Sequence, residues 1–266
     1  MSEASRMRVT LLGTGTSTGV PVIGCTCEVC TSADRRDHRT RSSCYVEAGG
    51  LGIVIDTGPD FRGQALRERL TRVDAVLFTH HHFDHVVGLD DLRPFFFANR
   101  RPMPCYARAN TASVLVAMFG YIFQDGSYPG VARLEMHAVD GPFAVPDRYG
   151  NRPPVPVQPV EVYHGDLPMY GYRIGRFAYL TDTSAIPEAS FALLHDLDVL
   201  VLDALRPEPH RTHFSIDQAV AVAERIGARQ TYFVHMSHNV LHAEADARLP
   251  AGMALGYDGL TFECRR

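Results

Sequence analysis

The sequence predicts an α/β protein that folds as one domain over residues 1–266, and three observations lead to this prediction. A chain of 266 residues, 45% of them apolar, can bury a large core, and sandwich-based chains of this size commonly stay single domains. Apolar runs of strand length alternate with helical patterns and turns. The last third alternates regularly, with a strand over 198–203, a helix over 215–226 and a strand over 230–234. We expect an insertion around 93–130.

The first elements are expected to be strands joined by glycine turns. Residues 8–12 form a short apolar strand that runs into the glycine-rich stretch 13–21. This stretch lacks the Gly-Lys-Ser/Thr ending of a phosphate-binding loop, so a tight turn of a sheet is the better interpretation. Residues 43–47 and 51–56 read as a hairpin, because the glycines between them tolerate the positive φ of a tight turn.

The middle of the chain has a less regular pattern. Asp60 can cap a helix that runs through Arg69. Residues 75–78 are wholly apolar, which predicts a buried strand. Residues 90–130 read as loosely organised around clustered aromatic side chains, with a short strand at 105–106 and a helix over 111–119. Residues 131–180 return to strand patterns, with prolines that mark turns and edges.

A cluster of ligand-type side chains follows the buried strand just described. Four of them lie within six residues: His80, His82, Asp84 and His85. If the backbone stays extended beyond the strand, His80, His82 and Asp84 lie on one side, close enough to share a metal ion. His85 opens the next turn and reaches a second ion from another direction. Imidazole and carboxylate ligands suit zinc, iron or manganese. His81 points to the opposite side and is left out of this set.

A pair of metal ions needs more ligands than this cluster supplies, and three later residues occupy similar positions. They follow the ends of apolar runs, as His80 does: His164, Asp182 and His235. Alone, each would be an ordinary turn residue, but the demand for further ligands favours a metal site. Asp56 also ends a predicted strand. It either orients a ligand histidine or forms the turn that starts the following helix, and both interpretations stay open.

Three cysteines form a second cluster of ligand type: Cys25, Cys27 and Cys30. Three thiolates at this spacing are typical of one tetrahedral structural zinc ion that lacks a fourth ligand. His238, three residues beyond His235, can face elsewhere and complete this site. The loop that carries both histidines would then support both metal sites. The alternative interpretation is three unrelated buried thiols.

The composition limits the partners and the location of the protein. A net charge of −4 offers no basic surface, so extended nucleic acid is not the favoured partner. No apolar run is long enough to span a bilayer, and residues 1–8 lack the apolar segment of a signal peptide. We therefore expect a cytoplasmic protein with no membrane partner, whose six cysteines are thiols or metal thiolates.

The order of the ligand residues resembles the five-motif signature of the metallo-β-lactamase superfamily. The signature reads His80-x-His82-x-Asp84-His85, followed by His164, Asp182 and His235. The resemblance covers nearly the whole chain. It implies a four-layer αβ/βα sandwich with a two-metal site along one edge of its sheets.

Within this superfamily the chain is most similar to the phosphodiesterase branch, and there to the PhnP family. Three features carry this resemblance: the opening Leu12-Gly-Thr-Gly15 with Pro21, the cysteine cluster, and the stretch 203–215 with His213 ahead of a helix. The sequence shows no flexible arm of the tRNase Z kind and no basic surplus. Transfer RNA processing is therefore disfavoured.

The resemblance implies a role for each residue of the site. One ion is held by His80, His82 and His164, and the other by Asp84, His85 and His235. Asp182 bridges the two ions. A structural zinc ion is held by Cys25, Cys27, Cys30 and His238. His213 matches the catalytic histidine that is not a metal ligand, and the nearby His210 remains the alternative. The resemblance also implies a homodimer.

The resemblance and the ligand chemistry together predict a hydrolase with two zinc or manganese ions. We expect it to open small ribose or nucleotide phosphodiesters, cyclic ones above all, to phosphate monoesters by means of a metal-bridging hydroxide. His213 would protonate the leaving oxygen. Two alternatives stay open: a thioester or lactone hydrolase of the glyoxalase-II kind, and a zinc-binding scaffold without turnover.

Overall fold

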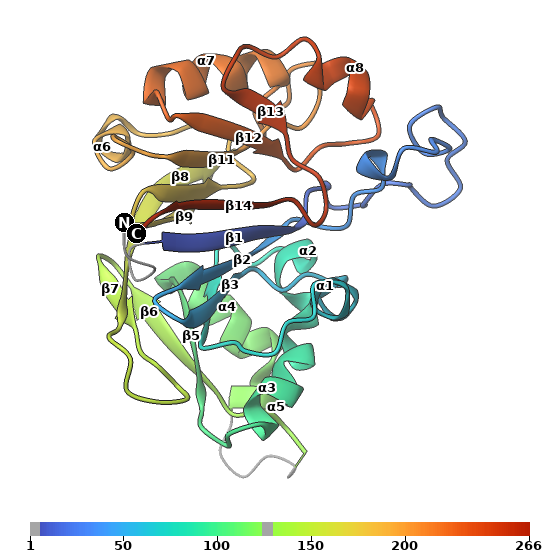
Figure 1. The fold of residues 1–266 in the computed structure, drawn as a ribbon. Coiled ribbons are helices and arrows are strands. Elements are labelled where there is room, and N and C mark those ends of the chain that lie inside the picture. Colours follow the sequence, from blue (N-terminus) through green and yellow to red (C-terminus); the bar gives the residue numbers. More distant parts are fainter. Residues whose placement is uncertain (1–5, 124–129) are drawn as a thin grey trace.

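Two β-sheets pack face to face and carry helices on their outer faces, in a computed structural model that describes residues 6–123 and 130–266 (Figure 1). Side chains of both sheets share one apolar core. Two further cores lie between each sheet and its own helices. The predicted α/β sandwich of four layers is therefore confirmed. Residues 1–5 and 124–129, the latter part of the expected insertion, lie outside the described residues.

The first sheet is built from the N-terminal half of the chain and from its last strand. Its strand order is β14 (Thr261–Arg265), β1 (Arg6–Gly13), β2 (Ser43–Ala48), β3 (Leu51–Ile55), β4 (Ala75–Phe78), β5 (Met103–Arg108) and β6 (Leu134–Val139). The helices on this side are α1 (Phe61–Arg67), α2 (Phe83–Val86), α3 (Arg93–Phe97), α4 (Ala109–Met118) and α5 (Gly120–Phe123). Short 3₁₀ helices span Arg35–Asp37 and Val87–Leu92.

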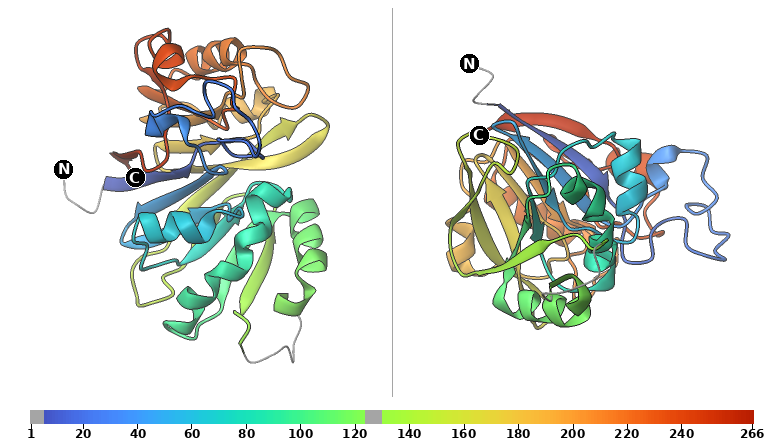
Figure 2. Two further views of the ribbon diagram at one scale, coloured as in Figure 1. Left: turned by 90° about the vertical axis from the view of Figure 1, so that its right-hand side faces the viewer. Right: turned by 90° about the horizontal axis from the view of Figure 1, so that it is seen from below.

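The second sheet is built from the C-terminal half. Its strand order is β13 (Met253–Leu255), β12 (Gln230–Val234), β11 (Val199–Asp203), β10 (Phe177–Leu180), β9 (Leu167–Ile174), β8 (Val155–His164) and β7 (Phe143–Val145). The helices on this side are α6 (Glu188–Phe191), α7 (Ile216–Ile226) and α8 (His242–Asp246). Figure 2 shows from the side that the two sets of helices lie on opposite sides of the strands.

Each sheet contains a parallel block, and these blocks position the site. Strands β3, β4, β5 and β6 run parallel to one another, as do β10, β11, β12 and β13. The carboxyl ends of parallel strands meet at one edge of their sheet, where loops carry side chains into a common space. A backbone hydrogen bond of 3.2 Å from Tyr170 to the carbonyl of Thr79 joins the two sheets near these ends.

Most of the strands and one capped helix follow the sequence predictions. The hairpin β2–β3 turns through Gly49 and Gly50, which have φ of 58° and 78°. The capping box of α7 is also present: the Ser215 side chain accepts from the backbone N–H of Gln218, and the Gln218 side chain accepts in return from Ser215.

Two local predictions were wrong in part. Helix α1 ends at Arg67 rather than Arg69. Asp60 occupies its N-cap position as predicted, but its carboxylate accepts the backbone N–H of Arg41 at 2.9 Å and makes no cap hydrogen bond to the helix. The stretch 90–123 is more regular than predicted, although the strand at 105–106 and the helix over 111–119 were predicted and correspond to β5 and α4. It forms α3, β5, α4 and α5, since its clustered aromatic side chains bury against the first sheet, and β5 lies inside that sheet between β4 and β6. Whether the stretch is an insertion remains a prediction.

Among the described residues no helix combines the length and the apolar character needed to cross a membrane.

Candidate metal centres

The predicted ligands gather where the parallel strands end. Thr79 and His80 follow β4, Asp182 follows β10, and His235 follows β12 directly. Asp56 follows β3 in the same way. Three of these residues have left-handed backbone, with φ of 63° at Asp56, 51° at Asp182 and 65° at His235. Such conformations are costly for residues other than glycine, and they concentrate at functional sites.

One ligand group consists of three histidines. His80, His82 and His164 each offer a nitrogen, and these nitrogens lie within 4.8 Å of one another. His80 Nε2 is 2.9 Å from His82 Nδ1. Burial lowers the pKa of His80 well below its usual value and lowers the pKa of His164 to about 4. Both rings are therefore neutral near pH 7 and keep the lone pair that a metal ion requires.

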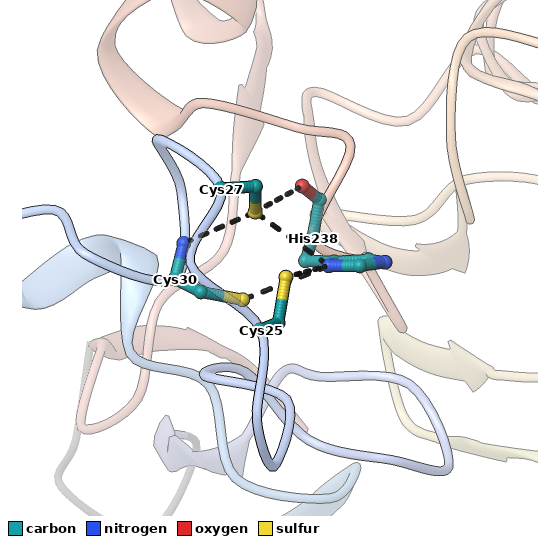
Figure 3. A group of neighbouring side chains, drawn as sticks. All are labelled: Cys25, Cys27, Cys30 and His238. Atoms are coloured by element: carbon teal, nitrogen blue, oxygen red, sulfur yellow. Dashed lines mark hydrogen bonds between the residues drawn. The ribbon is translucent and has the colours of Figure 1, made fainter.

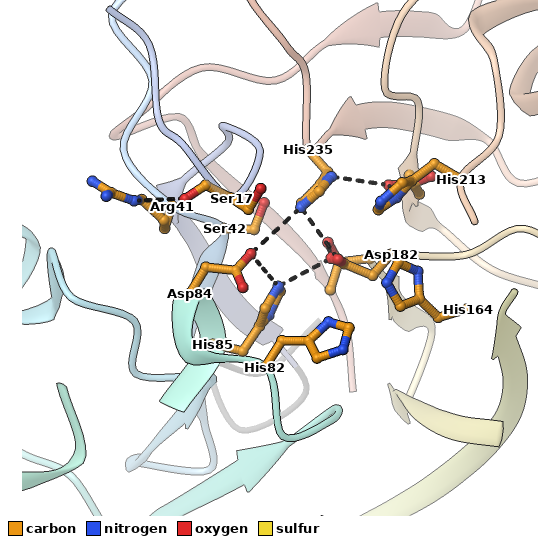
Figure 4. A network of polar contacts seen from close by, with 12 residues as sticks. Ser17, Arg41, Ser42, His82, Asp84, His85, His164, Asp182, His213 and His235 are labelled. Atoms are coloured by element: carbon orange, nitrogen blue, oxygen red, sulfur yellow. Dashed lines mark hydrogen bonds and ion pairs between the residues drawn. The ribbon is translucent and has the colours of Figure 1, made fainter. Parts of the chain in front are cut away.

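A second ligand group contains two histidines and two aspartates. One atom each of Asp84, His85, Asp182 and His235 lies within 4.8 Å of the others (Figure 4). His85 Nε2 is 3.2 Å from Asp84 Oδ2 and also 3.2 Å from Asp182 Oδ1. The other oxygen of Asp182 is 3.2 Å from His235 Nε2 and 3.9 Å from His80 Nε2. Asp182 thus faces both groups at once.

The backbone explains why Asp84 belongs to the second group. The expectation that extended backbone keeps Asp84 beside His80 and His82 was wrong. The extended stretch stops at His82, which has φ −68° and ψ 149°, and α2 begins at Phe83. A helical turn carries Asp84 and His85 to the other side, where the family resemblance placed them.

The donor set fits divalent metal ions. His85 Nε2 and His235 Nε2 are buried and have no hydrogen-bond partner among the described residues. Burial raises the pKa of Asp182, but His235, His85 and His80 outweigh it, so this pKa lies well below its ordinary value. Buried imidazoles that converge on carboxylates match the ligands of zinc or manganese. His81, excluded on sequence grounds, belongs to neither group.

Two carboxylates contact the ligand histidines at Nδ1, the ring nitrogen that faces away from the other ligands. Asp56 Oδ2 lies 2.7 Å from His85 Nδ1, and its carboxylate also accepts the backbone N–H and the hydroxyl of Thr79. Of the two interpretations left open for Asp56, these contacts favour the orienting one. Asp203, at the end of β11, was missed as a site residue. Its Oδ1 faces His213 Nδ1 at 3.2 Å and His235 Nδ1 at 3.5 Å.

His213 lies against both ligand groups. Its ring centroid is 4.7 Å from that of His235 and 4.6 Å from that of His164. His210, the alternative, is exposed and its ring centroid lies 5.2 Å beyond that of His213. His213 is therefore the histidine that borders the metal groups.

The cysteine cluster and His238 meet as a separate site (Figure 3). His238 Nδ1 lies 3.3 Å from the sulfur of Cys25 and 3.6 Å from those of Cys27 and Cys30. The backbone N–H of Cys30 lowers the pKa of Cys27 to about 7, which favours the thiolate. Four ligands without an open position are the pattern of a structural zinc ion.

Comparison with known proteins identifies relatives that align with nearly the whole chain. The family model described as "Beta-lactamase superfamily domain" matches residues 52–236. An octanoyltransferase of Porphyromonas gingivalis is 42% identical over 259 residues, which are 96% of this chain but 51% of that protein, so the chain spans about half its length. A crystal structure described as a new diphosphatase from the PhnP family is 46% identical and has a TM-score of 0.88, with 98% of each chain covered. Zinc-bound PqqB from Methylobacterium extorquens, 22% identical with a TM-score of 0.72, covers 96% of this chain and 99% of its own and shares the fold.

Proposed function

The chain belongs to the beta-lactamase superfamily and is a metal-dependent hydrolase similar to the PhnP family, and on this premise we propose that it hydrolyses small phosphodiesters at two divalent metal ions. Cyclic phosphodiesters of ribose or of nucleotides are the proposed substrates. The observation that carries the proposal is the position of Asp182. Its Oδ2 lies 3.2 Å from His235 of one ligand group and 3.9 Å from His80 of the other, and its Oδ1 lies 3.2 Å from His85. His213 borders both groups without belonging to the ligand set that the resemblance implies.

The ligand residues form two groups, one for each proposed ion. His80, His82 and His164 would hold one ion, Asp84, His85 and His235 the other, and Asp182 would contact both. When bound, two such ions activate a water molecule and offset the negative charge of the phosphoryl group. Asp56 keeps the His85 ring in its orientation through the 2.7 Å contact at Nδ1.

His213 supplies the proton that the leaving oxygen needs. Asp203 faces its Nδ1, so Nε2 is the nitrogen that remains for a substrate. Burial lowers the pKa of His213 below its ordinary value, and the nearby carboxylates of Asp182 and Asp84 offset only part of this effect. A positioned acid of this kind contributes about 10²- to 10⁴-fold to the rate.

A substrate with phosphorus fits the site better than an acyl substrate. An alkoxide leaving group needs a proton donor such as His213, whereas a thioester releases a thiolate that departs without one. The diphosphatase similar to this chain is named for cleavage at phosphorus. The name octanoyltransferase belongs to a protein about twice as long, so an octanoyl thioester is a necessary comparison in the assay.

Phosphorus NMR of the zinc- or manganese-loaded protein tests the proposal. The substrates are ribose 1,2-cyclic phosphate 5-phosphate, a 2′,3′-cyclic nucleotide, a linear diester and a dinucleoside diphosphate, with an octanoyl thioester followed by thiol release. We expect fast opening of a cyclic diester to a monoester and no thiol release. Thioester cleavage without any diester cleavage would overturn the proposal.

A further inference from the structure

Phe83 is a large apolar side chain that lies exposed between residues of the two ligand groups. It follows His82 of the histidine group and precedes Asp84 of the second group, and it is 67% exposed. His82 is exposed as well, so this turn is a part of the ligand cluster that opens to solvent. The reaction as described above gives the Phe83 ring no role.

Val87 extends the apolar surface of Phe83. It lies four residues later and is 39% exposed. Its backbone N–H donates to the carbonyl of Phe83, so the two residues belong to one helical turn and their side chains lie on one face. A single exposed apolar residue on a surface is ordinary. Two of them beside a cluster of metal-ligand type instead suit the apolar part of a substrate, because binding would remove them from water.

The turn that carries Phe83 is fixed from below by backbone hydrogen bonds. The N–H of His85 donates to the carbonyl of His82 at 3.0 Å, and the N–H of Thr57 donates to the carbonyl of His85 at 2.7 Å. The N–H of Gly88 in turn donates to the carbonyl of Thr57 at 2.9 Å. An aromatic ring with two side-chain torsions on such a backbone loses little conformational entropy when a ligand covers it.

We infer that Phe83 stacks on the base of a nucleotide substrate, with Val87 beside it. A phosphate bound between the two ligand groups lies one sugar ring away from the base of its own nucleotide. Phe83 is joined in the chain to one ligand residue of each group, so its ring borders that phosphate position. Every base has an aromatic face and can stack there. This inference rests on the proposed function and narrows its substrates from sugar phosphates to nucleotides.

A planar base fits Phe83 better than an acyl chain does. The exposed ring offers one flat face, and stacking needs no more than that. An alkyl chain gains its binding energy from burial on several sides, which a residue with 67% exposure does not provide.

A fluorescence titration tests the stacking directly. The chain contains no tryptophan, so Phe83→Trp introduces a single indole reporter. In the metal-loaded protein we expect saturable quenching by adenosine 3′-monophosphate and no quenching by ribose 5-phosphate, which lacks a base. Phe97→Trp is the matched control, because Phe97 is 39% exposed on α3, which carries no ligand residue, and it should not respond to either compound. Quenching of Phe83→Trp by octanoate but not by the nucleotide would overturn the inference.

Matched substrates test the same contact in turnover. Adenosine 2′,3′-cyclic phosphate and ribose 2,3-cyclic phosphate differ by the base. We expect kcat/KM of the parent to be higher for the nucleotide, on the order of 10-fold, which is the usual effect of one stacked base. Phe83→Leu should raise KM for the nucleotide more than it lowers kcat and should shrink this ratio about tenfold, whereas Phe83→Tyr should keep most of it. Phe97→Leu should leave the ratio unchanged. Equal kcat/KM values for both substrates in the parent would refute the stacking.

These measurements separate the inference from the proposed function. Quenching by the nucleotide reports base binding even if no phosphodiester is cleaved, so it would support the stacking while the proposed function fails. Cleavage of both cyclic phosphates at equal rates would keep the proposed function and remove the inference. Metal content and Tm of the Phe83 variants should match those of the parent, because the ring is exposed. Loss of metal in Phe83→Leu would show that the ring supports the ligand turn and would contradict the assigned role.

Discussion

Single residues at strand ends determine the geometry of the metal centre. Asp56, Asp182 and His235 adopt left-handed backbone, which costs on the order of 1–3 kcal/mol per residue. Their side chains are nevertheless buried, with contacts that hold neighbouring site residues. The strain is therefore offset by the packing of the two sheet edges. These turns bring carboxylate and imidazole groups from both sheets into one space.

At the scale of single residues, the sequence predicted which side chains are of ligand type better than it predicted the directions in which those side chains point. The candidate ligand residues could be picked out because they lie at or shortly after the ends of apolar runs. Asp84 was placed on the wrong side because nothing in the sequence announces that α2 begins at Phe83, one residue after His82. Asp203 was missed because only the folded loop after β11 and the neighbouring strand β12 bring His213 and His235 to its carboxylate. The available signals were its position at the end of a predicted strand and the resemblance of the stretch 203–215 to the PhnP family.

His213→Ala tests the proton donor. We expect kcat for a phosphodiester to fall about 10²- to 10⁴-fold while the metal content stays unchanged, because the ring borders the ligand groups but is not assigned to either. Steady-state kinetics and elemental analysis measure the two quantities on the same sample. His195→Ala, at an exposed histidine that contacts the carbonyl of Ala192, is the control. Turnover retained in His213→Ala would transfer the acid role to another group.

Asp182→Ala tests the carboxylate that faces both groups. Its removal would take a ligand from each of the two proposed ions and leave buried rings without their counter-charge. We expect loss of catalytic metal and of activity together, measured by elemental analysis and by the phosphodiester assay. Asp196→Ala, at an exposed aspartate, is the control. Retention of the catalytic pair of ions in Asp182→Ala would contradict the bridging role.

At the scale of elements, one loop joins the two candidate metal sites. His235 and His238 are three residues apart, and the carbonyl of Ser237 between them accepts from the buried side chain of Arg39 at 3.1 Å. Arg39 also pairs with the buried Asp37 at 2.9 Å, and Asp37 in turn accepts the backbone N–H of His242. Asp37 and Arg39, which follow the cysteine cluster in the chain, thus support the loop that positions His235.

Cys27→Ser tests whether the cysteine cluster is a structural zinc site. We expect the zinc content to fall by about one ion per chain and Tm to drop by at least about 5 °C, because zinc bound only by the folded chain stabilises that chain. The value of kcat below Tm should change less. Thr26→Ser, at the exposed position next to Cys27, is the matched control. A variant that melts like the parent but has lost turnover would show that the cluster acts in catalysis instead.

At the scale of the whole molecule, the layered architecture could be predicted from the sequence, but the pairing of its first and last strands could not. Alternating strand and helix patterns indicated α/β, and the family resemblance implied four layers. The sequence did not reveal that β14 pairs with β1, because Arg265 and Arg6 are partners from opposite ends of the chain. Such pairings depend on long-range packing rather than on local pattern. The expected homodimer stays a prediction.

Asp198 links the last strand of the first sheet to the second sheet. It precedes β11, and its carboxylate accepts the backbone N–H of Arg265 at 3.1 Å and Nε of the same residue at 2.7 Å. Arg176 donates to its other oxygen at 3.1 Å. The hydrogen bonds from Arg265 hold the pKa of Asp198 below its ordinary value, although partial burial opposes them. The ionised carboxylate is therefore the form that stabilises the fold.

Asp198→Asn should lower Tm at pH 7 by a few degrees, since the amide keeps the shape but loses the charge-assisted bonds. The sign of the pH dependence follows from the lowered pKa. The stabilisation is fully present above the unfolded pKa of about 3.9 and is lost as the pH falls through the lower folded value.

Melting curves of parent and variant should therefore differ at pH 7 and converge in acid. Asp196→Asn, two residues away at an exposed aspartate 3.9 Å from Arg176, is the control and should melt like the parent at every pH. A Tm difference between parent and Asp198→Asn that grows in acid would contradict a stabilising role for the ionised carboxylate. The backbone pairing of β14 with β1 would then be what holds the last strand in place.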